Sequence, residues 1–336
     1  MLASGRELKV MTRKEQAGFT LLETMVSLIV LMAVSAIVMN GVNQMMMTQG
    51  TIANRTEMHT SVRGATELLE QEIGQAGRIS LPPLPPGTTS WQMLTAILVP
   101  ADVAVTQPLV SFSPLLTTLF DGEQLLVDTG TNQETITITC PVAGACTNTW
   151  TAGPFYNSHA AGVPISAPGA FATGVVPPAP YPNGSTATTL KLYGDINGDG
   201  NMLYIEYTCV QGTQAAPGFL YRNQSAFDAA AKTWGAPPLP ANSALLTNLG
   251  TNPGGVPCFT YQVVPVGPYT FVTDVAVTLT EWTQSADPQT HIKQSETKAL
   301  LNVSPRNVFD AYLLARQDYT NRVQPMPWKT QTNLLP

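Results

Sequence analysis

Glu23 is the only charged residue in the apolar run 19–40. In a helix, roughly 20 such residues cross the ~30 Å hydrocarbon core of a bilayer. A carboxylate within such a span costs about 2.5–3.5 kcal/mol on insertion scales and needs a partner. Glu23 occupies the fifth position counted from Phe19. Cleavage of the Gly18–Phe19 bond would create an α-amine on Phe19, which is a chemically suitable partner for that carboxylate.

The segment Gly18–Glu23, GFTLLE, together with the apolar run behind it, resembles the cleavage and methylation signal of type IV prepilins and type II secretion pseudopilins. The resemblance implies that a prepilin peptidase cuts after Gly18 and methylates Phe19. It also implies that Glu23 pairs with the N-terminus of a neighbouring subunit during assembly. An ordinary signal anchor would not need Glu23, and a secretory signal peptide has a shorter apolar region of roughly 7–15 residues.

The leader, residues 1–18, is longer than prepilin leaders usually are, and Met11 offers an alternative start. Either start retains Arg13 and Lys14 before the apolar run. These cations predict a cytoplasmic N-terminus by the positive-inside rule. We therefore expect a single-pass protein of the bacterial inner membrane, with its head in the periplasm and later on the pilus or cell surface.

The composition is typical of an exported structural protein. Removal of the leader leaves 12 basic and 20 acidic residues, a net charge of −8, and charged residues are only 11 % of the chain. Because nucleic-acid binding needs a basic surface, the acidic balance predicts no nucleic-acid partner. With 26 glycines and 28 prolines, the chain is expected to be rich in loops.

The helix is expected to continue beyond the membrane-length segment 19–40 through an amphipathic segment, 41–78. No proline occurs between Phe19 and Pro82, and Gly77 is a plausible stop. Gly41 and Gly50 could distort the helix locally, or the helix could run straight through them. The expected apolar stripe consists of Val62, Ala65, Leu69, Ile73 and Ala76. The acidic residues in this region lie mostly off that stripe: Glu57, Glu67, Glu70 and Glu72.

A proline-rich linker, 79–88, separates the helix from a predicted β-rich head, 89–336. The fold class is therefore α+β: a long N-terminal helix packed on a loop-rich antiparallel β head. Alternation and β-branched residues predict strands at 135–139, 189–193, 203–207, 219–221, 258–264 and 274–282. The last is expected to pair with 291–303 across a turn at 285–288. Residues 153–187 and 235–257 are predicted to be long loops.

Two further segments resemble PilW-type minor pilins. Residues 70–77, EQEIGQAG, resemble the end of the long helix in that group, and residues 303–308, VSPRNV, resemble the end of its final strand. These matches favour a minor pilin that is incorporated into a type IV pilus or primes its assembly. The alternatives are a minor pseudopilin of type II secretion, a calcium-dependent adhesin displayed on a filament, and a membrane-anchored periplasmic enzyme.

Four cysteines in an exported domain predict two disulfides, and sequence alone allows three pairings. Cys140 and Cys146 enclose a five-residue loop with Pro141 and Gly144, which favours their pairing. Cys209 would then pair with Cys258. No C-x-x-C pair is present to suggest zinc or redox chemistry.

The segment Asp195–Glu206, DINGDGNMLYIE, satisfies the calcium-loop pattern D-x-[DN]-x-[DN]-G-x5-E. If the end of this segment is an extended strand, Glu206 lies roughly 16 Å away and water or another loop would complete the site. The alternative is a plain β-turn. A bound calcium ion would have a structural role, and no organic cofactor is expected. The candidate ligands are Asp195, Asn197, Asp199, Asn201 and Glu206.

Catalytic motifs find little support, so the sequence predicts a protein that is not an enzyme. The three histidines, His59, His159 and His291, are scattered and are predicted to be surface residues. Asp121, Glu123 and Asp128 are predicted to form a solvated turn around Gly122. The expected partners are instead prepilin peptidase, other pilins and minor pilins, and the pilus assembly machinery of the inner membrane.

Overall fold

The computed structural model describes residues 18, 20–101, 103–108, 110–114, 116, 119–141, 146, 150–181, 183–235 and 243–332. The chain divides into two compact units. One comprises Met1–Ala53 with Asp287–His291, and the other comprises Asn54–Ala286 with Ile292–Pro336.

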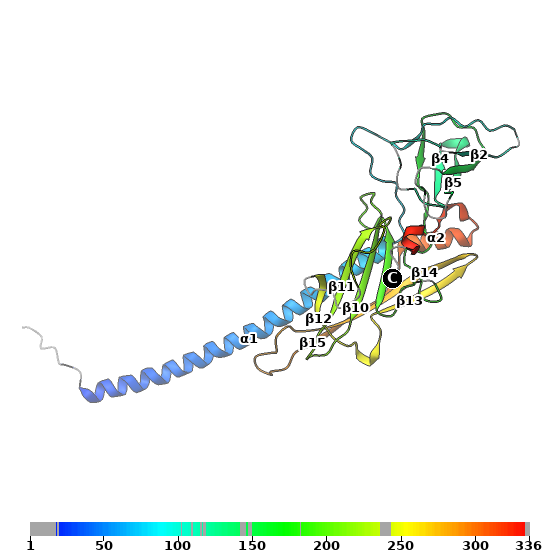
Figure 1. Cartoon of the computed structure of the whole chain (residues 1–336). Helices are drawn as coiled ribbons and strands as arrows, with labels where there is room; N and C mark the ends of the chain where they lie inside the picture. The colour runs from blue at the N-terminus through cyan, green and yellow to red at the C-terminus, as the bar shows by residue number, and fades with distance from the viewer. Residues whose placement is uncertain are drawn as a thin grey trace, which may run out of the picture. The chain divides into compact units, whose positions relative to one another are not determined.

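Helix α1, Leu21–Gln75, is 55 residues long and continues through Gly41 and Gly50 (Figure 1). It ends where the sequence predicts, because Gly77 adopts φ +83°, a conformation that favours glycine. The Gly77 amide then donates to the carbonyl of Tyr193 over 2.9 Å. A Cβ at Gly77 would lie 2.8 Å from Cγ2 of Val308, so the position has no room for a side chain.

Within the second unit, α1 buries one face. Met58 is the first fully buried residue, and all five residues of the predicted apolar stripe are buried as well. Most of them join a core cluster with side chains from strands of the head, among them Leu192, Leu220 and Val277. Burial of each large side chain is worth about 1.5–3 kcal/mol, so this stripe fixes α1 to the head.

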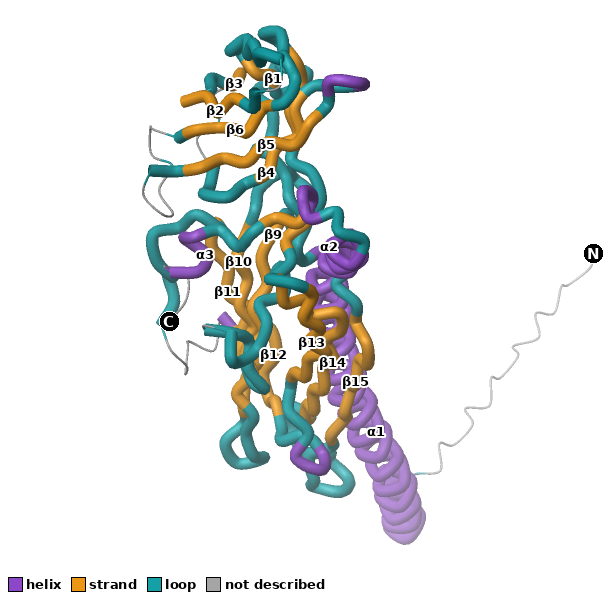
Figure 2. The backbone as a smooth tube through the Cα atoms, turned by 90° about the vertical axis from the view of Figure 1, so that its right-hand side faces the viewer, coloured by secondary structure: helices purple, strands orange, loops and turns teal. Residues whose placement is uncertain are grey.

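That core lies on a seven-stranded antiparallel sheet, here called the second sheet (Figure 2). Its order is β13-β14-β12-β11-β10-β9, with β15 paired to β14. Strands at every position that the sequence predicts are found here or in β5, and β15 pairs with β14 as expected. The strands are β9 (Thr189–Gly194), β10 (Leu203–Val210), β11 (Gly218–Ala226), β12 (Ala244–Leu249), β13 (Phe259–Val266), β14 (Tyr269–Trp282) and β15 (Ser295–Val303).

Another seven-stranded sheet, the first sheet, has the order β2-β6-β5-β4-β7-β1-β3. The prediction of long loops over 153–187 and 235–257 is wrong. Strands β6, β7 and β8 (Ala170–Phe171) form within or across the first, and β12 forms within the second. The strands of the first region are two to five residues long, and β6 and β7 contain prolines, so they carry little periodicity. The strands are β1 (Gln92–Met93), β2 (Val105–Pro108), β3 (Phe112–Ser113), β4 (Gln124–Val127), β5 (Glu134–Thr139), β6 (Thr151–Phe155) and β7 (Val163–Ser166).

The C-terminal segment connects with both halves of the head. Helix α2, Arg306–Arg316, is followed by β16, Val323–Gln324, which pairs in parallel with β8. The side-chain amide of Gln324 donates through Nε2 to the backbone carbonyls of Gln124 and Pro168 over 2.9 and 2.8 Å. Short helical segments complete the chain: η1 (Gly130–Asn132), η3 (Pro253–Gly255), η4 (Thr320–Arg322) and α3 (Trp328–Thr332).

Both disulfides form in the pairing that the short loop favours. Cys140 is bonded to Cys146, and Cys209 at the end of β10 is bonded to Cys258 before β13. In the chain-entropy model, a crosslink spanning 49 residues contributes on the order of 4 kcal/mol.

A buried ion pair also fastens α1 to the second sheet. Glu72, predicted to lie off the apolar stripe, is in fact buried. Its carboxylate accepts from Arg222 Nη2 over 2.5 Å and from the Tyr207 hydroxyl over 2.6 Å. Loss of Glu72 would therefore leave the guanidinium without its partner in a half-buried site.

We predict that Glu72→Ala lowers the free energy of unfolding by about 2–4 kcal/mol, because breaking one side of a buried pair strands the other charge. The measurement is urea unfolding of the full chain in detergent, followed by tryptophan fluorescence. Glu67→Ala, which removes an exposed carboxylate paired with Arg63 on the same helix, is the matched control and should have no measurable effect. Equal midpoints for the two variants would contradict the anchoring role of Glu72.

Candidate functional site

The N-terminal end of α1 is capped by Thr20. The Glu23 amide donates to Thr20 Oγ1 over 3.3 Å and to the Thr20 carbonyl over 3.0 Å. Thr20 and Glu23 thus have the spacing of a capping box, T-x-x-E, a signal that the sequence analysis missed. Gly18 is exposed just before the helix, and Phe19 lies outside the described residues. The Gly18–Phe19 bond therefore precedes helix α1 in the chain.

Glu23 itself lies in the first turn of α1 and is exposed. Unpaired amide groups and the helix dipole make this end of a helix positive, which favours a carboxylate there by roughly 0.3–1 kcal/mol. The end of the helix therefore places the Glu23 carboxylate in a favourable electrostatic position.

On the C-terminal side of Glu23, α1 has apolar side chains on all of its faces. Every residue from Leu21 to Gln49 is exposed, including leucine, isoleucine, valine and methionine side chains on every face. A helix that is apolar on all sides is typical of burial in lipid or among other helices. By length and composition alone, α1 is the one helix among the described residues that could cross a membrane.

A family described as the prokaryotic N-terminal methylation motif matches residues 13–39. Neither the comparison with curated proteins nor that with solved structures found a match. The motif covers the cations before the apolar run, Gly18, Phe19, Glu23 and most of the apolar run itself. Together with the capped apolar helix, it supports a type IV prepilin-like protein, either pilin-like or pseudopilin-like.

The predicted calcium loop forms the turn between β9 and β10. Asp195 is buried, and its Oδ1 accepts from the amides of Asp199 and Gly200 over 3.0 and 3.3 Å. Its Oδ2 lies 3.6 Å from Arg78 Nε. Asp199 Oδ1 accepts from the Asn201 amide, and these hydrogen bonds hold the pKa of Asp199 below its usual range. The protein's own donors therefore shape this turn.

Two of the other predicted ligands, Asn197 and Glu206, have surroundings that differ from those of Asp195. Asn197 is exposed, and Glu206 on β10 accepts from Lys232 Nζ over 2.6 Å and from the Tyr204 hydroxyl over 2.9 Å. Within the described part of the chain, no group of three or more His, Cys, Asp or Glu side chains is placed to share a metal ion. Structural calcium at this turn stays a prediction.

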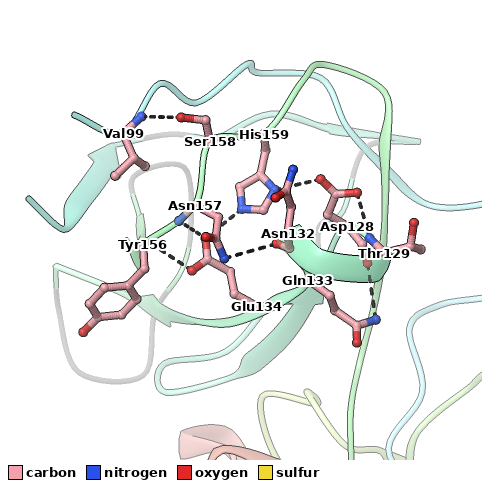
Figure 3. Close-up of polar contacts among 10 residues, drawn as sticks. All are labelled: Val99, Asp128, Thr129, Asn132, Gln133, Glu134, Tyr156, Asn157, Ser158 and His159. Atoms are coloured by element: carbon pink, nitrogen blue, oxygen red, sulfur yellow. Dashed lines mark hydrogen bonds and ion pairs between the residues drawn. The ribbon is translucent and has the colours of Figure 1, made fainter. Parts of the chain in front are cut away.

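The prediction that His159 is a surface residue is wrong. His159 is buried and lies between two carboxylates (Figure 3). Its Nδ1 lies 3.0 Å from Asp128 Oδ2, and its Nε2 lies 2.7 Å from Glu134 Oε1. The His159 side chain is 0 % exposed. The hydrogen bond from His159 lowers the pKa of Asp128. Sequence reasoning missed this cluster because its residues come from three segments.

The prediction of a solvated turn around Gly122 is also wrong for Glu123. Burial raises the pKa of Glu123 to about 8, partly offset by the hydrogen bond from the Phe120 amide. Glu281 on β14 is similarly buried, at 4 % exposed, where its carboxylate accepts from the Ser61 hydroxyl of α1. Burial, with smaller contributions from the nearby Glu57 and Glu296, raises the pKa of Glu281 to about 7, and the hydrogen bond from Ser61 partly offsets the rise.

The raised pKa of Glu281 predicts a pH-dependent stability. The protonated carboxyl stabilises the fold fully below its unfolded value of 4.5, and that contribution is lost as pH rises through about 7. We expect Glu281→Gln, which is neutral throughout, to be nearly as stable as the wild type at about pH 5 and more stable at about pH 8. Chemical unfolding at both pH values is the measurement. Exposed Glu70→Gln is the control, and a Glu281→Gln effect independent of pH would refute the assignment.

Proposed function

We propose that this chain is a minor pilin subunit of the PilW type, incorporated into a type IV pilus or priming its assembly. The observation that carries the proposal is the coincidence of the methylation motif with Glu23 in the capped first turn of an apolar, exposed helix. The resemblance of residues 70–77 and 303–308 to PilW-type minor pilins favours this subtype. In the proposal the protein is not an enzyme and acts only through assembly.

The first step is removal of the leader after Gly18 by prepilin peptidase, followed by methylation of Phe19. Cleavage leaves a cationic amine at the start of a helix whose own N-terminus is already positive. In a lipid environment neither that amine nor Glu23 is stable without a partner. Pairing of Glu23 with the amine of a neighbouring subunit neutralises both charges. One contact in the assembled state therefore removes two unpaired charges from the lipid.

The second step is packing of apolar helices in the filament. Residues 21–49 expose apolar side chains on every face, so α1 can contact several neighbouring helices at once. The buried stripe and the Glu72–Arg222 pair join the other part of α1 to the second sheet. The head is therefore carried with the helix when the subunit is incorporated. We place the subunit first in the inner membrane, with its head in the periplasm, and then on the pilus.

A minor pseudopilin of type II secretion is the alternative that the methylation motif supports equally, because the N-terminal signal is common to both classes. The two differ in the machinery that the subunit joins. Deletion of the gene should abolish piliation in the first case and block export of secreted enzymes in the second. A filament-displayed adhesin would instead leave assembly intact and lose surface binding.

We predict that Glu23→Ala is processed normally but fails to enter filaments, with a loss of about tenfold or more in the sheared filament fraction. Charge pairing acts at assembly, whereas the cleaved bond lies before the helix. The measurement is an immunoblot of sheared filaments and membranes from the same cells. Glu70→Ala, which removes an exposed carboxylate farther along α1, is the control and should assemble normally. Wild-type incorporation of Glu23→Ala would exclude the proposed pairing.

We also predict a graded effect of side-chain size at Gly18. Gly18→Ala should slow processing, and Gly18→Leu should block it, because the peptidase must bind the backbone on both sides of the bond closely. Pulse-chase labelling resolves precursor from mature protein by mass. Gly41→Ala, a substitution with nothing within 4 Å in the structure, is the control and should be processed at the wild-type rate. Rapid cleavage of Gly18→Leu would show that processing occurs elsewhere.

A further inference from the structure

The His159 cluster, a buried imidazole between two half-buried carboxylates, is a group that the proposed function does not use. Asp128 follows β4, Glu134 begins β5, and His159 lies in the connection between β6 and β7. The ring of Phe155, 5.8 Å away, packs edge-on against the imidazole. Between Arg78 and Lys191 the sequence contains no lysine or arginine, so His159 is the only residue of that stretch able to neutralise these carboxylates as a cation.

The geometry requires an additional proton. A neutral imidazole has one N–H donor and one acceptor nitrogen, and an ionised carboxylate only accepts. Here each ring nitrogen faces a carboxylate oxygen, at 3.0 and 2.7 Å. Both contacts are hydrogen bonds only if the cluster holds one proton more than a neutral imidazole between two carboxylates. Without that proton, a lone pair of the fully buried imidazole would face a carboxylate oxygen, which is costly.

The same carboxylates organise the surrounding backbone. Glu134 accepts from the backbone amides of Tyr156 and Asn157 over 2.8 and 3.1 Å (Figure 3). With its contact to His159, it therefore makes three contacts with the β6–β7 connection. His159 in turn exchanges two backbone hydrogen bonds of 2.9 Å with Ile97. The Val99 amide donates to Ser158 Oγ over 2.9 Å. The cluster therefore joins the β4–β5 hairpin, the β6–β7 connection and the segment 97–99.

These joined segments display two apolar side chains to solvent. Leu98 is 81 % exposed and Tyr156 is 68 % exposed. Leu98 directly follows Ile97, which pairs with His159, and the Tyr156 amide donates to Glu134, so both residues lie on segments that the cluster contacts. Exposed large apolar side chains held by an ordered backbone form a defined surface. The same side chains on a loosened loop would not.

We propose that the His159 cluster is a proton-dependent lock, in which a proton shared by His159, Asp128 and Glu134 holds the Ile97–Val99 and Tyr156–His159 segments in place. The lock is closed while the imidazole is charged and both carboxylates are ionised. It opens at higher pH, when the imidazole loses its proton, and at lower pH, when the carboxylates gain theirs. This regulation of the head does not depend on the proposed role in a filament.

The direct test is nitrogen-15 NMR of the full chain in detergent, labelled at its three histidines and assigned with His59→Gln and His291→Gln. The proposal predicts that both ring nitrogens of His159 carry protons at about pH 7. It also predicts that the Tyr156 and Asn157 amides lose hydrogen-exchange protection at the same higher pH at which the second ring proton is lost. A single ring proton at about pH 7, or protection that is unchanged when the second proton leaves, would overturn the lock.

A variant provides an independent readout. His159→Gln keeps a polar side chain but cannot carry the charge, so hydrogen exchange of Tyr156 and Asn157 should speed up by about tenfold or more. Exposed His291→Gln is the control and should leave these amides unchanged. The disulfide-bonded second sheet reports whether the variant is folded, through protection of β10 and β14 amides. Wild-type exchange at Tyr156 and Asn157 in folded His159→Gln would contradict the proposal.

Discussion

One constraint dominates this protein: a single helix must be stable in two different environments along its length. Along residues 21–49, α1 exposes apolar side chains on every face, and from Met58 onward it buries only one stripe against a sheet. The first arrangement is stable only among lipids or other helices. The second needs a folded β head. Because both lie on one unbroken helix, whatever binds the apolar part also holds the head, and this coupling suits a subunit of a filament.

Carboxylates of the same kind perform different tasks because their surroundings differ. Glu23 is exposed in the first turn of α1, at the positive end of the helix. Glu72 is buried, but Arg222 pairs with it, so it acts as an anchor. Glu281 is buried, and among the described residues the Ser61 hydroxyl donates to it but no cation pairs with it, so its pKa rises to about 7. The role of each glutamate therefore depends on its exposure to water and on the cations near it, and not on its residue type.

Periodicity and composition were sufficient for the elements with strong local patterns. The apolar stripe of α1, its end at Gly77, and the long strands β10 and β14 follow from spacing alone. In the first sheet only β5 has a comparable pattern, and the other strands were not predicted, because they are two to five residues long and several contain prolines. Buried polar groups were missed because their partners lie in distant segments. Nothing local in the sequence distinguishes His159 from the exposed His291, and only the fold brings it to Asp128 and Glu134.

The account depends most on what happens at Gly18 and Phe19, and the mature N-terminus tests it most directly. The protein would be isolated from cells with and without prepilin peptidase, and its N-terminal peptide identified by mass spectrometry. The account predicts a peptide that begins with N-methyl-Phe19 in cells with the peptidase and an uncleaved leader in cells without it. An intact N-terminus in both, or a cut at another bond, would contradict it and leave only an apolar helix joined to a β head.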